Sequence, residues 1–340
     1  MSAIVSENIS LKPHNSFNID EPARYFVEVN SINELQKVLS DSRFKDIPFF
    51  VLGGGSNILF TKPFEGIVIK NAIMGIDVVK EDATNYYVKA GAGEMWHDVV
   101  MYCVNNNYGG LENLSLIPGN VGAGPIQNIG AYGVELKDCL YTVEAVNILD
   151  QSIKEFSNIQ CKFGYRDSVF KKELKGKYII TAVTYKLDKQ PQLNTSYGAI
   201  EKELEAQGVK QITIKDVSNA VCKIRGGKLP DPTDLGNAGS FFKNPEVACE
   251  KYESLKAIFD DIVAYPTTEG KMKLAAGWLI EYCGWKGKQI GDAGVHKMQA
   301  LVLVNYGTAT GKEIFQLSEK IIQDVKTTFG VELEREVNIL

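Results

Sequence analysis

Three clusters of glycine, none of which completes a dinucleotide-binding fingerprint, are the feature that most limits the fold of this chain. They lie at residues 53–57 (GGGSN), 91–93 (GAG) and 119–124 (GNVGAG). A fingerprint G-x-G-x-x-G needs a third glycine three positions after the second. That position is occupied in turn by Ile58, Trp96 and Gln127. The pattern therefore disfavours a doubly wound dinucleotide fold and leaves turns or ligand-binding loops as alternatives.

A fourth cluster at residues 307–312 (GTATGK) is placed between a predicted strand and a predicted helix, as a phosphate-binding loop would be. It is one residue short between its glycines, and Glu313 takes the place of the magnesium-binding hydroxyl. We therefore predict a tight strand–helix turn here.

The composition of the chain excludes several broad classes of protein. The chain has 340 residues, of which 44% are hydrophobic, so it can bury substantial cores and is not a disordered chain. Its 37 Lys+Arg and 42 Asp+Glu give a net charge of −5, which argues against non-specific binding to nucleic acid or to a membrane surface. No apolar run approaches the roughly 20 residues that span a bilayer, and the first residues do not resemble a signal peptide. We expect a cytoplasmic protein that binds neither nucleic acid nor membrane.

The six cysteines form no C-x-x-C pair, and the three histidines have no metal-motif spacing. We expect free thiols and no metal site.

Periodicity and turn residues predict a mixed α+β chain. Helices are predicted where apolar residues recur at helical spacing; the first has a capping box of Ser31 and Glu34, and the last ends at Gly330. The predicted helices are residues 32–39, 95–104, 217–225, 274–282 and 313–329. The predicted strands are residues 48–52, 66–70, 86–90, 143–149, 178–187, 300–305 and 331–340.

The order of the long motifs is similar to that of one enzyme family. The motifs are VLGGGSN, GLENLSLIPGNVGAGPIQNIGAYG, FGYRDSVF, KLPDP, NAGSFFKNP, KLAAGWLI and LEREV, from about Ser16 to Val337. In this order they resemble the UDP-N-acetylenolpyruvoylglucosamine reductases. Tyr197, in NTSYGAI, resembles the tyrosine loop of one of the two subtypes of that family.

The resemblance implies an FAD-binding fold of the vanillyl-alcohol-oxidase-like (PCMH) type, followed by a C-terminal α+β substrate domain. We expect an FAD-binding domain of two subdomains at 17–190 and a connecting segment with the tyrosine loop at 191–215. A substrate-binding domain would follow at 216–330, and a terminal strand with a catalytic glutamate at 331–340.

The resemblance also implies the reaction. Non-covalently bound FAD would mediate the reduction of UDP-N-acetylglucosamine enolpyruvate to UDP-N-acetylmuramate by NADPH, a step in peptidoglycan precursor synthesis. The implied partners are this small UDP-sugar and NADPH, and we expect a monomer.

Three residues match the catalytic positions of the family. Arg166 in GYRDS would stabilise the developing enolate, Ser240 in NAGSFFKN would donate the proton, and Glu336 in LEREV would orient or protonate at the enolate. Without the resemblance, Arg166 would more simply form an ion pair with Asp167, and Ser240 would be a turn or capping residue. Glu334 is a rival for Glu336, because residues two apart share a face in a strand.

The remaining matches concern binding. The positions that match flavin contacts are Gly53, Gly54, Gly55, Ser56, Asn57, Pro118, Gly119, Gly122, Asn128 and Gly133. The positions that match contacts to the substrate or its diphosphate are Tyr132, Tyr197, Lys228, Asn244, Lys273 and Gln299.

Two departures from the family pattern and two rival functions stay open. Asn18 stands where glycine is usual in the family, and Asn338 stands where many relatives have arginine. The rival functions are another oxidase or dehydrogenase of the same flavin fold and a non-catalytic nucleotide-sugar binder. Enzymes of the first kind often tether their flavin through His or Cys, but His97 and Cys103 lie in a helix-like stretch and are expected to be packed.

Overall fold

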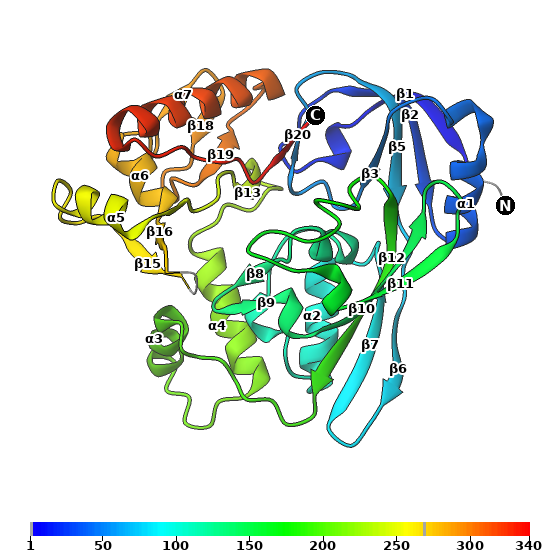
Figure 1. Ribbon diagram of the computed structural model, residues 1–340, viewed down its shortest axis with the longest axis horizontal. Helices are drawn as coiled ribbons and strands as arrows, with labels where there is room; N and C mark the ends of the chain where they lie inside the picture. Colours follow the sequence, from blue (N-terminus) through cyan, green and yellow to red (C-terminus); the bar gives the residue numbers. More distant parts are fainter. Residues whose placement is uncertain (1–2, 268–269) are drawn as a thin grey trace. The chain divides into compact units, whose positions relative to one another are not determined.

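The computed structural model describes residues 3–267 and 270–340, and the chain divides into two compact units (Figure 1). Both units are assembled from separate stretches of the sequence. The first unit consists of residues 1–9, 23–54 and 65–227. The second unit consists of residues 10–22, 55–64 and 228–340.

A four-stranded sheet opens the first unit. Its strand order is β1 (Val5–Ser10), β2 (Pro22–Val29), β5 (Phe64–Asn71) and β3 (Phe49–Leu52). β3 runs parallel to β5, with Phe49 opposite Ile67. The β-branched side chains Ile67 and Ile69 of β5 pack against Leu35 of helix α1 (Ile32–Ser40) in one apolar cluster. The Ser31 hydroxyl accepts from the Glu34 amide as expected, but the Glu34 carboxylate accepts from the amide of Asn30 instead of Ser31.

An antiparallel five-stranded sheet carries most of the first unit. Its order is β11 (Ile153–Ser157), β10 (Leu140–Asn147), β12 (Tyr178–Asp188), β7 (Asn85–Gly91) and β6 (Ile76–Glu81). The central strand β12 is buried from Ile179 to Tyr185, and its Val183 is opposite Val143 on one side and Ala90 on the other. The continuous apolar run YIITAVTYKL is typical of such a doubly flanked strand.

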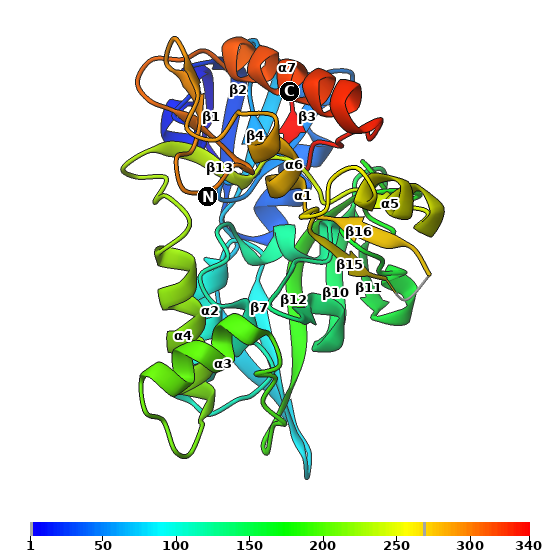
Figure 2. The ribbon, with the colours of Figure 1, turned by 90° about the vertical axis from the view of Figure 1, so that its left-hand side faces the viewer.

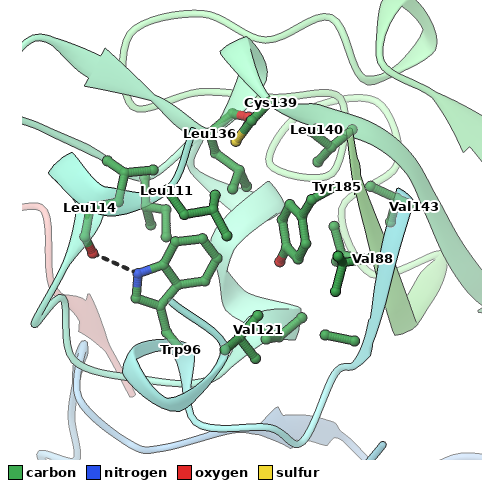
Figure 3. Packing of buried hydrophobic residues seen from close by; sticks show 14 of the residues in the cluster. Val88, Trp96, Leu111, Leu114, Val121, Leu136, Cys139, Leu140, Val143 and Tyr185 are labelled. Atoms are coloured by element: carbon green, nitrogen blue, oxygen red, sulfur yellow. Dashed lines mark hydrogen bonds between the residues drawn. The ribbon is translucent and has the colours of Figure 1, made fainter. Parts of the chain in front are cut away.

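Helix α2 (Trp96–Asn105) contributes the largest side chain to the core of this unit. Figure 3 shows the Trp96 indole among Leu111, Leu114 and Tyr185. The indole N–H donates to the Leu114 carbonyl at 2.8 Å, and the ring meets Tyr185 edge-on at 5.8 Å. The indole therefore satisfies its polar atom while it packs as a hydrophobic group.

Two helices complete the first unit and pack on each other (Figure 2). They are α3 (Gly198–Ala206) and α4 (Ile214–Gly226). Ile200 and Leu204 of α3 meet Val217 and Val221 of α4. The sequence predicts α4, whereas α3 lies in the stretch interpreted as a connecting segment.

Short strands β8 (Gly130–Ala131) and β9 (Val134–Glu135) form a hairpin.

The second unit contains a mixed arrangement of short strands and three helices. One sheet has the order β13 (Gly236–Ser240), β19 (Val302–Asn305), β18 (Ala293–Val295) and β17 (Gln289–Ile290). A smaller sheet has the order β14 (Glu246–Val247), β16 (Met272–Leu274) and β15 (Ala264–Pro266). The helices are α5 (Cys249–Lys256), α6 (Ala276–Tyr282) and α7 (Gly311–Phe329).

Helix α7 begins and ends as its sequence predicts. Thr310 and Glu313 form a reciprocal capping box, so residues 307–312 are a strand–helix turn, and Gly330 ends the helix at φ 61°. An aromatic cluster packs its last turn, since the Phe329 ring lies 4.8 Å from Phe259 and 5.8 Å from Trp278.

The predicted terminal strand over 331–340 is wrong for most of its length. Only Asn338–Ile339 forms a strand, β20, which pairs in parallel with β4 (Ile58–Leu59). Arg335 makes a side-chain bond to Ser318 of α7 at 2.8 Å. Alternating apolar residues at 331, 333 and 337 produced the strand pattern, but they pack an irregular segment onto the unit.

The six cysteines are free thiols. Within residues 3–267 and 270–340, no helix is long and apolar enough to cross a bilayer.

The core of the first unit predicts an unusual stabilising substitution. The Tyr185 hydroxyl is buried and has no hydrogen-bond partner among the described residues, and this burial raises the pKa of Tyr185 well above its ordinary value. Tyr185→Phe should raise the free energy of unfolding by about 1 kcal/mol, because it removes an unsatisfied polar atom. Urea unfolding measures the change. Thr181→Val is the matched control, since it deletes a hydroxyl that is bonded to Glu144 and should destabilise. A destabilised Tyr185→Phe protein would contradict the assignment.

Candidate active site

Two glycine-containing loops whose backbones approach each other closely form the candidate flavin cradle of the first unit. A Cβ on Gly54 would lie 2.6 Å from the Asn120 Oδ1 atom and 3.0 Å from the Gly119 Cα atom. Gly119 itself has φ 103°, a conformation that favours glycine. These positions therefore require glycine for close approach of the two backbones, which the composition of the clusters indicated only in general terms.

Neighbouring contacts hold the cradle in place. The Lys70 ammonium donates to the Gly53 carbonyl at 2.5 Å, and the Trp96 amide donates to the Gly119 carbonyl at 2.9 Å. A Cβ on Gly122 would lie 2.7 Å from the Ala92 Cβ atom, so this glycine also permits close packing.

One polar atom of the cradle is available to a ligand. The Asn120 amide nitrogen bonds the Gly93 carbonyl, which fixes the orientation of the side chain and leaves its Oδ1 atom buried without a partner among the described residues. Glycine amides and an unpaired acceptor are the kind of donors and acceptors that an isoalloxazine or ribityl group would use. We conclude that Gly53, Gly54, Gly119 and Gly122 suit FAD.

Several residues around this region adopt left-handed backbone conformations that side chains disfavour. They include three predicted site residues, namely Asn128 at φ 47°, Tyr132 at φ 50° and Arg166 at φ 52°. Such conformations persist only where the surroundings impose them, and they cluster at functional sites. Sequence periodicity gives no signal for them.

The Asn128 side chain is engaged in hydrogen bonds to other parts of the protein. Its amide nitrogen donates to the Gly164 carbonyl at 3.0 Å and to the Glu135 carboxylate, and its oxygen accepts from the Lys137 amide. Asn128 therefore ties the predicted flavin loop to the turn that carries Arg166. Only its backbone is left for the predicted flavin contact.

The Asp167 carboxylate is engaged away from its neighbour Arg166. It forms an ion pair with Lys172. The Arg166 guanidinium donates to the Gly130 carbonyl at 3.0 Å, and the Lys171 ammonium donates to the Arg166 carbonyl. The Arg166 side chain is thus directed toward the β8–β9 hairpin, next to Tyr132.

The structure brings two predicted substrate residues together. The rings of Tyr132 and Tyr197 lie 5.2 Å apart and are nearly perpendicular, although 65 residues separate them in sequence. Tyr197 precedes α3 and is half exposed. The packing of α3 on α4 positions this loop.

Arg225, in the last turn of α4, lies beside the predicted site residue Tyr132 and was not singled out from the sequence. Its Nε atom donates to the Leu116 carbonyl at 3.2 Å, and its guanidinium lies beside the Tyr132 hydroxyl. Burial raises the pKa of Tyr132, and the Arg225 charge opposes that rise. The signal in sequence was a single arginine immediately before the glycines that end a helix, which is also an ordinary helix terminus.

In the second unit, Ser240 and Glu336 lie on adjoining segments. The Glu336 amide donates to the Phe241 carbonyl at 2.8 Å, and Phe242 is bridged to Arg335. The Asn57 amide nitrogen donates to the Glu336 carbonyl at 3.3 Å. The backbone of the predicted glutamate is therefore bonded to the residue that follows the predicted proton donor and to one predicted flavin residue.

Ser240 and the rival glutamates Glu336 and Glu334 differ in their surroundings. The half-buried Ser240 hydroxyl makes no hydrogen bond to the described residues. The rival Glu334 is exposed, and its carboxylate forms an ion pair with Lys243. Glu336 is half-buried. The choice of Glu336 over Glu334 as the catalytic glutamate stays a prediction.

Four further predicted substrate residues also belong to the second unit. The Asn244 side-chain oxygen accepts from the Ala276 amide at 2.9 Å and so caps α6. Lys273 lies 3.7 Å from Glu246, and the Gln299 oxygen accepts from the Leu301 amide. Lys228 is exposed.

The two residues that depart from the family pattern, Asn18 and Asn338, each fit their local backbone structure. Asn18 has φ 58°, so the position requires the left-handed conformation that glycine adopts freely and asparagine tolerates best among other residues. The Asn338 backbone and side chain both donate to the Asn57 carbonyl, at 3.1 and 3.0 Å. Both asparagines support the segments that carry site residues.

Comparison with known proteins shows the same two parts. The family model described as FAD binding domain matches residues 23–156, and the one described as UDP-N-acetylenolpyruvoylglucosamine reductase, C-terminal domain, matches residues 231–340. The chain is 50% identical over 337 residues to the UDP-N-acetylenolpyruvoylglucosamine reductase of Flavobacterium johnsoniae, covering 99% of each chain. It is 49% identical over the full length of both chains to that of Pseudomonas syringae pv. syringae.

The chain belongs to the UDP-N-acetylenolpyruvoylglucosamine reductase family. The crystal structure of the reductase from Thermus caldophilus has the same fold, with a TM-score of 0.69 at 24% identity and coverage of 100% of this chain and 99% of that chain. The predicted family and the α+β class with an FAD-binding domain are confirmed, and the chain is an FAD-dependent oxidoreductase. The residue-level roles remain predictions.

The cradle of this reductase predicts the effect of one methyl group. Gly54→Ala should weaken FAD binding by about 10- to 100-fold, because its Cβ would press against the Gly119 backbone and push the two loops apart. Flavin fluorescence in titrations of apoprotein measures the dissociation constant.

Gly198→Ala is the matched control, since a Cβ on Gly198 meets no atom within 4 Å. Equal FAD affinity in the two variants would show that the loops do not form the cradle.

Proposed function

We propose that this chain reduces UDP-N-acetylglucosamine enolpyruvate to UDP-N-acetylmuramate with NADPH, and that Ser240, Glu336 and Arg166 are its catalytic residues. The observation that carries the proposal is the hydrogen bond between the Glu336 amide and the Phe241 carbonyl. It places a half-buried carboxylate beside the segment of an unbonded serine hydroxyl, inside the two motifs that match the catalytic positions of the family.

The reaction demands three functions of the protein. When bound, FAD carries a hydride from NADPH to the terminal carbon of the substrate double bond. The chain must stabilise the negative charge that grows on the carboxylate side, supply a proton to the second carbon, and bind the diphosphate. Charge that grows only in the transition state is met best by fixed donors.

Ser240 suits the proton transfer. A serine hydroxyl is a weak acid, so it gives up a proton only to a strongly basic carbon and only when held close to it. β13 positions Ser240 opposite Val302 of β19. Because the hydroxyl has no competing bond among the described residues, it is available to the substrate.

Arg166 suits the growing charge. A guanidinium can hold a carboxylate through two parallel hydrogen bonds, which an ammonium cannot. Its left-handed backbone and the bond to Gly130 fix where the group points. Glu336 would then orient the reacting groups or protonate the enolate, and the lysines Lys228 and Lys273 would serve the diphosphate as point charges.

Non-covalent flavin is favoured over a tethered one. The His97 Nδ1 atom accepts from the Leu116 amide at 3.0 Å, and burial raises the pKa of Cys103 to about 12. Neither side chain is prepared to act as a nucleophile. Release of all flavin on denaturation would agree with this reading, whereas flavin retained on the chain would favour another oxidase of the fold.

The finer assignments of partner and place are proposals as well. We infer a monomer that works in the cytoplasm and binds neither membrane nor nucleic acid. The net charge of −5 and the six free thiols support this inference, because free thiols persist in reducing compartments.

Ser240→Ala should separate the two halves of the reaction. Flavin should still bleach on mixing with NADPH, but its recovery on adding the enolpyruvyl substrate should slow by about 10²- to 10⁴-fold, the usual contribution of a positioned acid. Anaerobic stopped-flow absorbance measures both steps. Equal slowing of both would mean that Ser240 is not the proton donor, and wild-type protein that consumes no NADPH would favour the nucleotide-sugar binder.

Glu336→Gln and Glu334→Gln form a matched pair two residues apart. We expect Glu336→Gln to lower the rate of substrate reduction by about 10²-fold or more, because it changes the carboxylate beside the Ser240 segment. Glu334→Gln should stay within about threefold of wild type, since it loses only an exposed ion pair. Steady-state kinetics at saturating substrate measures both, and the reverse order would transfer the role to Glu334.

A further inference from the structure

Arg225 occupies a position that its own helix does not explain. Although it ends α4, its Nε atom bonds the Leu116 carbonyl and not a carbonyl of the last turn of α4. The guanidinium lies beside the Tyr132 hydroxyl, and the Arg166 charge acts on it. Arg225 therefore links the end of α4 to the loop at Leu116 and to the turn of the β8–β9 hairpin.

No carboxylate is among the groups that shift the pKa of Arg225. These groups are Tyr132, Cys222 and Arg166, and the Arg225 charge in turn acts on His97. Burial and the Arg166 charge both lower the pKa of Arg225. An anion bound beside Arg225 would oppose both effects, because it favours the charged form of the guanidinium.

Three residues around Arg225 have strained backbone conformations. Leu116, which accepts its hydrogen bond, has φ 58°. Tyr132, which contacts its guanidinium, has φ 50°, and Arg166 has φ 52°. None of the three is a glycine or an asparagine, the residues that adopt this conformation at least cost. The chain thus accepts strain at each of the three positions that surround one cation, which is typical of a preorganised site.

We propose that Arg225 is a second catalytic guanidinium, which binds the carboxylate of the enolpyruvyl group together with Arg166. This inference rests on the proposed function. The ligand is a carboxylate that gains a second negative charge during the reaction.

The charge balance of the reaction explains the need for two cations. The enolpyruvyl carboxylate carries one negative charge. When a hydride forms the new C–H bond at the terminal carbon, the π pair moves to the second carbon and is shared with the carboxylate, which then carries two charges. The proton from Ser240 forms the second C–H bond and returns the group to one charge. A second guanidinium therefore stabilises the transition state more than the bound substrate, as catalysis requires.

Arg225→Met tests the proposal in rapid mixing. Flavin reduction by NADPH should be unchanged within about twofold, and flavin recovery at saturating enolpyruvyl substrate should slow by about 10²- to 10³-fold, the loss typical of one such donor. The substrate dissociation constant, measured from the perturbed flavin spectrum, should rise by only about tenfold. Arg225→Lys should restore part of the recovery rate, because it keeps the charge without the fork.

Three controls separate this role from other roles. Lys223→Met removes a cation two residues away that is exposed and paired with Glu203, and it should leave both half-reactions unchanged. Tyr132→Phe removes the hydroxyl that Arg225 contacts. If Tyr132→Phe and Arg225→Met slow recovery equally and the double variant is no slower, Arg225 acts only through Tyr132 and the proposal fails.

The other outcomes are equally informative. An unchanged recovery rate at saturating substrate, with only a weaker dissociation constant, would make Arg225 a simple binding residue and overturn the proposal. Loss of FAD with an unchanged recovery rate would place it on the cofactor and also overturn it. If wild-type flavin does not recover with the substrate, the proposed function itself is at fault, and Arg225 is not the cause.

Discussion

The close approach of two loop backbones is the constraint on which the candidate site of the first unit depends. Gly54 and Gly119 leave no space for a side chain, and the Asn120 amide fills the gap between them while it bonds Gly93. The same loop holds the core, because the Trp96 amide bonds the Gly119 carbonyl and its indole bonds Leu114. Core packing around Trp96 and the geometry of the cradle are therefore coupled, and a change in one is transmitted to the other.

In the second unit, one short hydrogen-bonded junction positions several predicted site residues. The segment after Ser240 pairs with residues 334–336, and Asn57 bonds both Glu336 and Asn338. This pairing also distinguishes two glutamates of the same type. Lys243 engages Glu334 at the surface, whereas Glu336 stays half-buried. The sequence pattern alone could not separate them, because it predicted a strand in which both residues share a face.

Sequence reasoning succeeded where local rules decide the structure. The long apolar run of β12, the capping box of α7 and its glycine stop at residue 330 follow from periodicity and from the hydrogen bonds that helix ends need. It failed where tertiary contacts override a pattern, as in residues 331–340, whose apolar alternation packs an irregular segment. It could not find Arg225, because an arginine near a helix end is ordinary until its partners Leu116 and Tyr132 are known.

The left-handed residues include one departure from the family pattern. Asn18 stands where glycine is usual in the family, and it adopts φ 58°, a conformation that glycine adopts freely and asparagine tolerates. Tyr132 and Arg166 adopt the same conformation with larger side chains, at a cost of order 1–3 kcal/mol each. Such conformations persist where the surrounding structure imposes them, and they cluster at functional sites. In the proposed mechanism, Arg166 and Arg225 would meet the charge that appears during the reaction. Groups that are held in place beforehand stabilise such a charge best, since they need not reorganise at that moment.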